Sequence, residues 1–520
     1  MRLPGTLTVS RRRSIVLAGL LLALGSCARP PERPDILFIS IDTLRSDRLS
    51  LYGYDLPTSP RLDEFAREAL VFTHAQTPRA KTTPAMASVF TGLYPHDHGV
   101  RDLASPLDRR VPVLAEQLKS GGYKTIGIVA NWVLTEERSG LARGFMVWNE
   151  ELPDQVGVPP HNVQQRRATS MTDTALELLE LDSAPKPEGQ RAPWFAWLHY
   201  MDPHGAYDPP EEHKLFDREP DWLPAPDSFP AHPIHKLRLA DYNVPASAEG
   251  PDGRIDLAKV RALYDGEIHY VDAEIGRLFD ALRAAGRFDS TLIIVTSDHG
   301  ESLGEHRYWF EHGFYTYEAT CRVPLLIHLP SKPGAPAPTG LRSSDVSLVD
   351  LTPTLLEYLK LAPLPVRDIS RTRPYGTSFA RLLPEARDKR HPVYSEKVER
   401  ADLSGTIQDK AVRLGDWKLI RRYTQLLPEG PGAPLTSGAE RELVVLSEEL
   451  YELETDPNEE RNLIGSPPAG APVAELRALL LEFFEADTDL AELAQILQRQ
   501  REELERDDPE SLRNLEALGY

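Results

Sequence analysis

Cysteine is scarce in this sequence, since 520 residues contain only Cys27 and Cys321. Two cysteines cannot form the disulfide framework on which small secreted domains depend, so a packed core has to hold the fold together. Hydrophobic residues make up 41% of the chain, which is enough for such a core. Cys321 lies beside the apolar run VPLLIHL, and we expect it to be a buried, unreactive thiol.

An excess of basic residues is also lacking. Asp and Glu number 79 against 59 Lys and Arg, which gives a formal net charge of −20. A chain of this charge repels polyanions, so nucleic acid is not an expected partner. An anionic substrate would need a local group of cations or histidines to overcome the charge. The acidity is equally compatible with a simple role in solubility.

Long hydrophobic runs are lacking as well. The apolar run at 15–24 is too short to span a bilayer, follows three arginines, and ends in Leu-Gly-Ser-Cys. This segment resembles the signal peptide of a bacterial lipoprotein, with residues 1–26 removed, Cys27 lipidated and residues 27–34 serving as a linker. Ala28 after the cysteine favours a periplasm-facing protein anchored at the outer membrane, in contact with the membrane only through its lipid. An ordinary signal peptide with an incidental cysteine is the alternative.

Short apolar runs alternate with amphipathic stretches through most of the chain, which is typical of βα units and a parallel sheet. The predicted strands are 35–42, 124–131, 194–202, 290–298 and 323–330. The predicted helices are 60–70, 111–120, 166–181, 257–285 and 349–360. We therefore predict an α/β fold over residues 35–385, with a large, mostly parallel sheet flanked by helices.

The remaining chain differs in pattern. Residues 205–256 are rich in proline and weak in periodicity, which favours a lid-like insert. Strand-like runs separated by turns predict a smaller α+β domain at 386–472, and the charged residues 473–520 predict a helical tail. The oligomeric state is left open by the sequence.

Three predicted strands end directly in an acid: Asp42, Asp202 and Asp298. Ligands of open α/β sheets bind outside the carboxyl ends of the strands, so these side chains are candidates for one shared crevice. A fourth candidate is Thr82, because the Pro84 that follows it fits the first turn of a helix capped by Thr83. The positive end of a helix dipole favours an alkoxide and a bound oxyanion.

Several motifs together carry a resemblance to a known family. TTPAMASVFTGLYPHDHGV, DILFISIDTLRSDRLSLYGY, TSDHGESLGEH and FAWLHYMDPHGAYDPP occur in an order similar to that of the sulfatases, in the alkaline-phosphatase-like superfamily. Later segments, including ELYELETDPNEERNL, extend the resemblance over roughly residues 35 to 465. The resemblance implies an enzyme that hydrolyses ester bonds.

The resemblance also implies a metal site and a set of catalytic residues. Asp42, Asp298, His299 and Thr82 match positions that bind one divalent cation. Oxygen and nitrogen ligands suit Zn or Mn, and His299 makes Ca less favoured. His204 and His312 match residues that contact the ester's anionic group or its leaving oxygen, so both are assigned to catalysis and substrate binding. His306 is a weaker candidate, and His96 and His98 match a structural turn.

The sequence departs from the sulfatase pattern at the catalytic residue. Sulfatases convert a cysteine or serine to formylglycine, and Thr82 cannot become that aldehyde, so no formylglycine is expected. Met86 replaces the signature arginine. Asn131 and Trp132 replace a Lys-x-His pair, which assigns Asn131 to substrate binding. A sulfated threonine cannot expel its sulfate by forming an aldehyde. The phosphoryl group of a phosphothreonine, by contrast, is removed by attack of water or an alcohol, so this departure from the family pattern favours phosphoryl transfer.

Three hypotheses follow from the sequence. The first is a hydrolase of sulfate or phosphate esters that uses Thr82 as its nucleophile. The second is a cell-envelope transferase of phosphoethanolamine or glycerophosphate, although such relatives usually carry several transmembrane helices. The third is a non-catalytic binding protein on a sulfatase scaffold. The expected partner is an anionic ester, either a small molecule, a glycan or a lipid head group.

Overall fold

The computed structural model describes residues 33–156, 163–181, 192–223, 244–250, 253–331, 336–365, 376–384, 388–399, 407–426 and 442–485. The predicted signal peptide, the lipidation site Cys27, most of the linker and the tail beyond residue 485 lie outside these ranges. No helix formed by the described residues is both long and apolar enough to cross a membrane.

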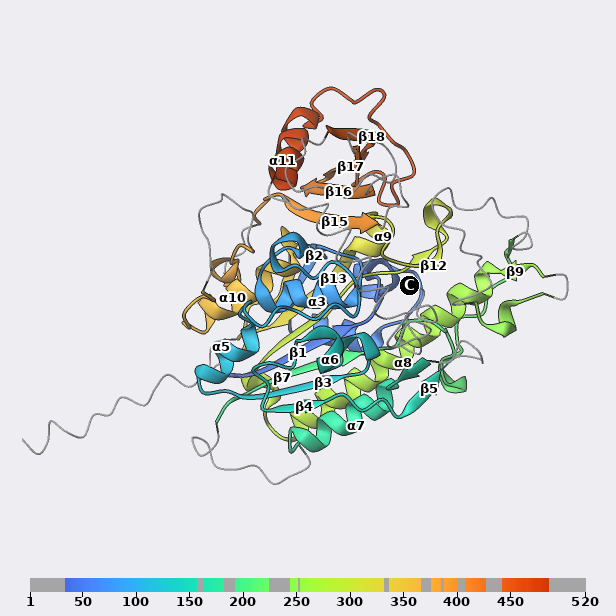
Figure 1. The fold of residues 1–520 in the computed structure, drawn as a ribbon. Coiled ribbons are helices and arrows are strands. Elements are labelled where there is room, and N and C mark those ends of the chain that lie inside the picture. The colour runs from blue at the N-terminus through green and yellow to red at the C-terminus, as the bar shows by residue number, and fades with distance from the viewer. Residues whose placement is uncertain are drawn as a thin grey trace, which may run out of the picture. The chain divides into compact units, whose positions relative to one another are not determined.

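An eight-stranded sheet forms the centre of the protein (Figure 1). In spatial order its strands are β14 (Gly340–Ser347), β2 (Leu70–Gln76), β13 (Arg322–His328), β10 (Thr291–Ser297), β1 (Asp35–Ile41), β7 (Trp194–Tyr200), β3 (Lys124–Val129) and β4 (Val147–Asn149). Only β13 runs antiparallel to its neighbours. The prediction of a large, mostly parallel sheet is therefore confirmed.

Helices cover both faces of this sheet. One group comprises α2 (Pro60–Ala66), α7 (Ala168–Leu178) and α8 (Leu257–Ala284), and the other comprises α3 (Thr82–Thr91), α5 (Leu114–Ser120) and α10 (Leu351–Tyr358). Short helical turns are α4 (Pro95–His98), α6 (Glu136–Ser139) and α9 (Glu318–Cys321). The helix predicted from residue 111 begins only at Leu114, because Val113 is extended and Glu116 reaches back to its N–H group.

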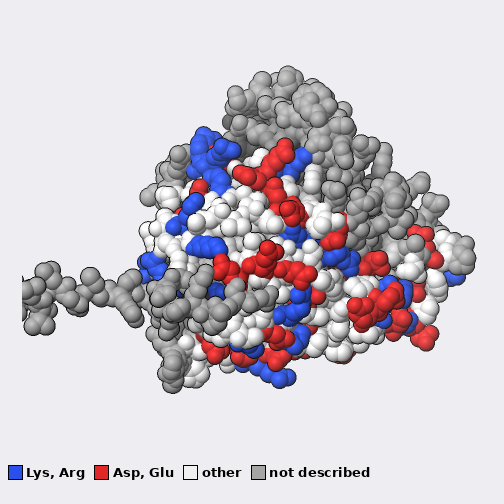
Figure 2. Space-filling view, turned by 90° about the horizontal axis from the view of Figure 1, so that it is seen from below, with Lys and Arg blue, Asp and Glu red and all other residues white. Residues whose placement is uncertain are grey.

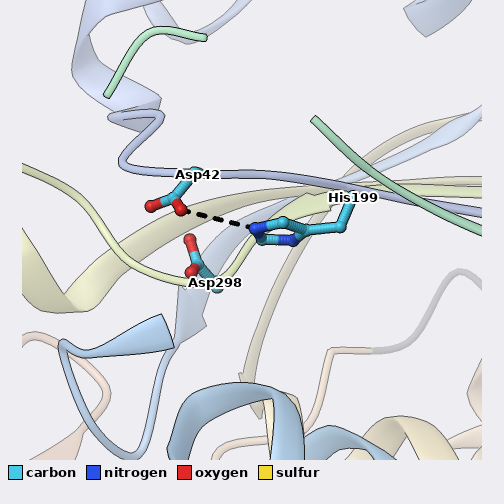
Figure 3. Close-up of side chains that lie close together, drawn as sticks. All are labelled: Asp42, His199 and Asp298. Carbon is cyan, nitrogen blue, oxygen red and sulfur yellow. Dashed lines mark hydrogen bonds and ion pairs between the residues drawn. The ribbon is translucent and has the colours of Figure 1, made fainter. Parts of the chain in front are cut away.

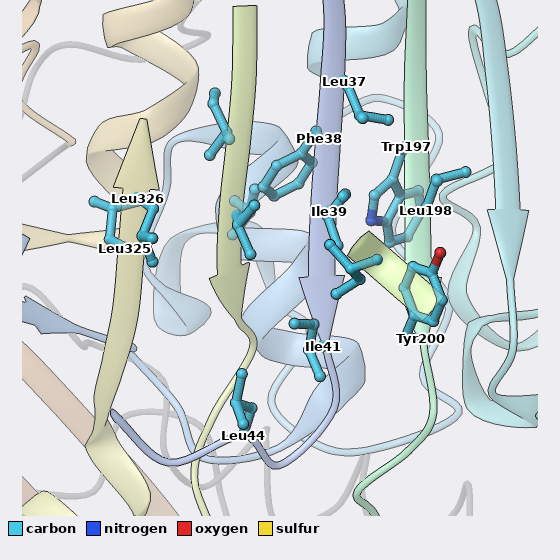
Figure 4. Packing of buried hydrophobic residues seen from close by; sticks show 14 of the residues in the cluster. Leu37, Phe38, Ile39, Ile41, Leu44, Trp197, Leu198, Tyr200, Leu325 and Leu326 are labelled. Atoms are coloured by element: carbon cyan, nitrogen blue, oxygen red, sulfur yellow. The ribbon is translucent and has the colours of Figure 1, made fainter. Parts of the chain in front are cut away.

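The strands next to the centre are buried on both faces, which explains why they read as nearly continuous apolar runs. Figure 4 shows Phe38 of β1 and Trp197 of β7 within this core. Both rings pack against Phe90 of α3, with centroids 6.1 and 4.5 Å away. Tyr200 lies on the opposite face, where its hydroxyl meets Thr172 of α7 at 2.9 Å. The core thus fixes helix α3 against the central strands.

Among the described residues, three two-stranded ribbons accompany the main sheet. They pair β5 (Asp154–Val156) with β6 (Val163–Gln165), β8 (Trp222–Leu223) with β9 (Ile255–Asp256), and β11 (Ser302–Leu303) with β12 (Trp309–Glu311). The ribbon of β11 and β12 follows β10 in the chain and shapes the loop that leads to residue 312.

A smaller antiparallel sheet follows, in the order β15 (Val393–Glu399), β16 (Ile407–Leu414), β17 (Trp417–Leu426) and β18 (Glu442–Glu452). Helix α11 (Val473–Glu485) packs on β16 and β17. Strand β15 lies against the larger sheet, because Glu396 donates its N–H to the carbonyl of Pro78 at 2.8 Å. A smaller C-terminal sheet was predicted from the sequence and is present.

A buried network of charges joins the two sheets. Glu318 of α9 accepts from Arg413 at 2.7 Å and from Lys418 at 2.9 Å, and both cations belong to the smaller sheet. Lys418 also contacts Glu459 at 2.9 Å, and Gln76 of β2 donates to both carboxylate oxygens of Glu318. These charges are buried but mutually paired, as buried charges have to be.

Charge is mixed over the face shown in Figure 2, where acidic and basic side chains of the described residues are interspersed. An anionic substrate therefore has to be attracted by groups within a site rather than by this face of the protein.

Candidate active site

Asp42 and Asp298 follow two adjacent parallel strands, β1 and β10, at the same edge of the sheet. The strands pair in register, with Ile41 beside Ser297, so Asp42 and Asp298, which follow these residues, lie side by side (Figure 3). Thr43 adopts a left-handed backbone conformation, with φ of 54°, and its N–H donates to Asp298 Oδ1 at 3.3 Å. This turn holds the two carboxyl groups together in the interior.

One oxygen of each carboxyl group is left over. Among the described residues, Asp42 Oδ1 and Asp298 Oδ2 are buried and have no hydrogen-bond partner. His299 Nε2 lies 3.8 Å from the first atom and 3.4 Å from the second. The other ring nitrogen, Nδ1, donates to the carbonyl of Gly300 at 3.0 Å, so Nε2 carries a lone pair. Two oxygens and one nitrogen with these properties fit a divalent cation.

The second oxygen of Asp42 is already engaged. Asn131 donates its amide to Asp42 Oδ2 at 2.6 Å, and His199 Nε2 lies 3.4 Å from the same oxygen. Asp42, His199 and Asp298 also form a cluster in which one ligand atom from each lies within 4.8 Å of the others. For a cation we favour His299 over His199, because its lone pair faces the two oxygens that lack partners.

Thr82 lies at the start of helix α3, beside the carboxyl pair. Its Oγ1 lies 3.3 Å from His299 Nε2 and 3.5 Å from Asp42 Oδ2. The residue is fully buried. The predicted cap is wrong in detail, because the helix begins at Thr82 and the hydroxyl of Thr83 donates to the carbonyl of Val133 instead. Thr82 is thereby the helix residue whose hydroxyl faces the candidate cation site.

His204 and His312 lie beside this group. The ring centroid of His312 is 4.3 Å from that of His299 and 5.4 Å from that of His204. His204 Nδ1 donates to the carbonyl of Gly205 at 2.9 Å. His312 Nδ1 is paired with Glu301 Oε1 at 3.2 Å. The three imidazoles thus form one cluster, in which His299 contacts Thr82 and the carboxyl pair. Such a cluster can stabilise an anion.

Burial and neighbouring charges shift the pKa values in this site in different directions. Burial would raise the pKa of Asp42, but the hydrogen bond with His199 and the nearby imidazoles lower it below its usual range. Burial and the charge of Asp42 raise the pKa of Asp298 well above its usual range. Burial lowers the pKa of His204. Burial lowers the pKa of His312 well below its usual range, and the neighbouring imidazoles of His299 and His204 contribute to that shift. A site with carboxyl pKa values pushed apart is characteristic of functional centres.

Other sequence candidates lie elsewhere. Asp202 does not join the crevice, because it accepts the N–H of Ala168 at the start of α7 and pairs with Arg167. His306 stacks on Tyr317 with ring centroids 3.6 Å apart and donates to or accepts from none of the site residues. Asn131, assigned to substrate binding, has its amide nitrogen on Asp42 and its oxygen on the N–H of Val133, which suits a positioning role.

The described part of the 205–256 insert packs on the protein next to the site. Tyr207 is buried and its hydroxyl donates to Glu301 at 3.2 Å. Asp208 donates its N–H to Glu267 of α8 at 2.9 Å. The insert therefore begins at the catalytic histidine candidate His204 and continues along α8, a position compatible with the predicted lid.

Sequence reasoning missed two site residues, His199 and Glu301. His199 lies in an apolar strand, two residues after Trp197 on the same face, and the alternation of β-strands points it toward the end of β1. A polar residue on that face of an otherwise apolar strand was the available signal. Glu301 follows the Asp298-His299 pair and contacts His312, which no spacing in the sequence indicates.

Comparisons with known proteins agree with this architecture. A protein-family model described as Sulfatase matches residues 34–361. The chain is 26% identical to an N-acetylglucosamine-6-O-sulfatase of Bacteroides thetaiotaomicron, over 91% of each chain. It is also 26% identical to a choline-sulfatase of Rhizobium meliloti, over 86% of this chain and 85% of the relative. The solved structure of a phosphonate monoester hydrolase of Agrobacterium radiobacter superposes with a TM-score of 0.62 and 23% identity, covering 88% and 96% of the two chains.

Proposed function

The chain belongs to the sulfatase family, and from that premise we propose that it is a metal-dependent hydrolase of anionic esters with Thr82 as its nucleophile. One observation carries the proposal. The Thr82 hydroxyl lies within 3.5 Å of both His299 and Asp42, at the point where two buried carboxylate oxygens have no partner among the described residues.

Asp42, Asp298 and His299 would hold a divalent cation, with Thr82 Oγ1 beside it. A bound cation would supply positive charge that favours ionisation of the hydroxyl and stabilises the transferring group. The start of helix α3 contributes in the same direction, because its free N–H groups and dipole favour negative charge at Thr82.

The first step is a displacement at the phosphorus or sulfur of the ester. A bond forms between Thr82 Oγ1 and that atom while the bond to the leaving oxygen breaks. The hydroxyl proton is lost to solvent as Thr82 ionises, because Asp42 Oδ2, although 3.5 Å away, already accepts from Asn131 and His199. In the second step water attacks the same atom and gives a proton to the histidine, His204 or His312, that protonates the leaving oxygen in the first step. The bond to Thr82 breaks, and Thr82 takes its proton back from solvent.

His204 or His312 protonates the leaving oxygen. In the free protein burial lowers both pKa values, which favours the neutral form of each ring. An anionic ester beside them would raise these pKa values again, so that the protonated form arises only when substrate is bound. The proton would sit on His204 Nε2, because Nδ1 is held by the carbonyl of Gly205.

The chemistry at Thr82 favours a phosphorus ester over a sulfate ester. A threonine ester intermediate has to be released by water, and this release is accessible at phosphorus when charge is stabilised by positioned groups. The similarity to a phosphonate monoester hydrolase supports this choice, whereas the similarity to an N-acetylglucosamine-6-O-sulfatase supports a sulfated sugar. Both substrates are anionic esters, and the experiment below distinguishes them.

Purified protein should be assayed with Mn²⁺ or Zn²⁺ against aryl sulfate, phosphate monoester, phosphodiester and phosphonate monoester. We expect turnover of a phosphorus ester that is abolished in Thr82→Ala and retained in Thr83→Ala, a neighbouring buried hydroxyl that bonds to Val133 instead. Mass spectrometry of a quenched reaction should find the phosphoryl group on Thr82. Equal turnover by Thr82→Ala would refute the nucleophile, and a preference for aryl sulfate would refute the choice of phosphorus.

We also propose, from the sequence alone, that the chain is a lipoprotein of the cell envelope. Its Cys27 lies outside the described residues. Replacing Cys27 with serine should release the protein from the membrane fraction of its host, and unchanged membrane association would contradict lipidation at this residue.

A further inference from the structure

A line of hydrogen bonds runs through the core to Asp42. Trp197 donates its indole N–H to Ser40 Oγ at 2.9 Å, Ser40 Oγ lies 2.8 Å from His199 Nδ1, and His199 Nε2 lies 3.4 Å from Asp42 Oδ2. Strand alternation explains the line, since Ser40 and Asp42 share one face of β1 while Trp197 and His199 share the same face of β7. All four side chains are buried, so water does not compete for these bonds.

The donors and acceptors along this line fix the proton on His199. Trp197 can only donate, so Ser40 Oγ accepts from it. Among the described residues, the only other partner of the Ser40 hydroxyl is His199 Nδ1, so the hydroxyl proton points there. An Nδ1 that accepts leaves the proton of a neutral ring on Nε2. His199 therefore donates to Asp42 Oδ2, along the contact drawn in Figure 3.

We propose that His199 is a positioning residue for Asp42 and not a ligand of the cation. Together with Asn131 it engages Asp42 Oδ2, which leaves Oδ1 to face Asp298 and His299. Trp197 and Ser40 serve to hold His199 in the donating tautomer. The inference rests on the proposed function only in requiring a cation at Asp42.

The alternative is that His199 is itself a ligand, as its place in a cluster with Asp42 and Asp298 suggests. A ligand needs a lone pair on Nε2, so its proton would have to lie on Nδ1 and point at Ser40. Ser40 would then accept twice and its own proton would have no acceptor among the described residues. Leaving a buried donor unpaired is costly, which favours the donating tautomer.

The test measures cation affinity rather than turnover. Isothermal titration with Mn²⁺ is carried out on wild type, His199→Leu, His199→Gln and Trp197→Phe. Glutamine retains an N–H donor near the position of Nε2, whereas leucine fills the space without one. The control is His328→Leu, which replaces a buried histidine of β13 in the same sheet whose ring contacts the carbonyl of Thr291. Absorption spectra of the Co²⁺ forms report the ligand set.

We expect His199→Leu to weaken Mn²⁺ binding by about 10- to 100-fold, the usual effect of losing a hydrogen-bond partner of a metal ligand. His199→Gln should restore most of the affinity, Trp197→Phe should weaken it less than leucine does, and His328→Leu should leave it unchanged. The Co²⁺ spectra should be the same in all variants that bind.

Three results would overturn the inference. Unchanged affinity in His199→Leu would show that Asp42 needs no such support. A Co²⁺ spectrum in His199→Gln that has lost a nitrogen ligand would show that His199 binds the cation directly. A wild-type protein that binds neither Mn²⁺ nor Co²⁺ would overturn both the proposed metal dependence and this inference. Failure of the inference alone would instead appear in the His199 variants while wild type still binds the cation.

Discussion

A divalent cation should stabilise the folded protein, and Asp298→Asn should abolish that stabilisation. Asparagine is nearly isosteric with the carboxyl group. Its oxygen can keep the bonds that Asp298 Oδ1 accepts from the N–H groups of Thr43 at 3.3 Å and His299 at 2.8 Å. Its amide nitrogen would replace Oδ2, where it can donate to His299 Nε2. Without a cation, the variant should therefore lie within about 1.5 kcal/mol of wild type, as volume-conserving changes do.

With a cation the two proteins should separate. A ligand that binds only the folded state adds about 2.7 kcal/mol at a concentration 100 times its dissociation constant. Wild type should gain this stability, whereas Asp298→Asn loses the free carboxylate oxygen and offers an N–H group in its place. The expected difference in unfolding free energy, measured with Mn²⁺ against a chelator, is thus larger than the cost of the substitution itself.

The assay is denaturant unfolding followed by tryptophan fluorescence, with and without Mn²⁺. Asp272→Asn is the matched control, because Asp272 is a buried acid whose pKa burial raises to about 7, yet both its oxygens accept backbone N–H bonds. This control should keep the full response to the cation. An Mn²⁺ response in Asp298→Asn equal to that of wild type would place the cation elsewhere and refute the reasoning.

Three further predictions concern other parts of the protein. Burial lowers the pKa of His98 to about 3. Below about pH 6.5 this histidine is therefore protonated in the unfolded chain but not in the folded protein. The free energy of unfolding should decrease as the pH falls below 6.5, by about 2 kcal/mol at pH 5. Comparison of urea unfolding at pH 7 and pH 5 should show this loss reduced in His98→Gln. His204→Gln should lower kcat by about 10²- to 10⁴-fold for an ester with a poor leaving group, and much less for an activated aryl ester; equal losses for both would argue against proton donation. Lys418→Met should cost about 3–5 kcal/mol, because it leaves Glu318 and Glu459 buried without their shared cation; a loss below 1 kcal/mol in thermal unfolding would contradict this.

The central strands of the main sheet were predictable because a strand that is buried on both faces has a continuous apolar sequence. The positions of Asp42 and Asp298 were predictable for the same reason, since the end of a buried strand in a parallel sheet is where a ligand site forms. Resemblance to the sulfatases then supplied His204 and His312, and in the structure their rings cluster with His299, which contacts Thr82.

Contacts between distant segments were not predictable. His199 is separated from Asp42 by 157 positions, and only the pairing of β1 with β7 brings the two together. Asp202 has the same sequence context as Asp42, at the end of a buried strand. It is drawn away from the crevice because the N–H of Ala168 at the start of α7 binds it. The sequence pattern identifies an acid at the end of a strand, but it does not identify the residue that binds its carboxylate.

Glu318 has a consequence for the modularity of the protein. Its carboxylate belongs to the chain segment that leads into β13, whereas its cations Arg413 and Lys418 come from the smaller sheet. A chain truncated after the larger sheet would retain the acid and lose both cations. Exchange of the C-terminal part with that of a relative would succeed only where the incoming strands offer equivalent charges. The smaller sheet therefore cannot be removed or exchanged independently of the larger one, and the two parts have to be expressed and redesigned together.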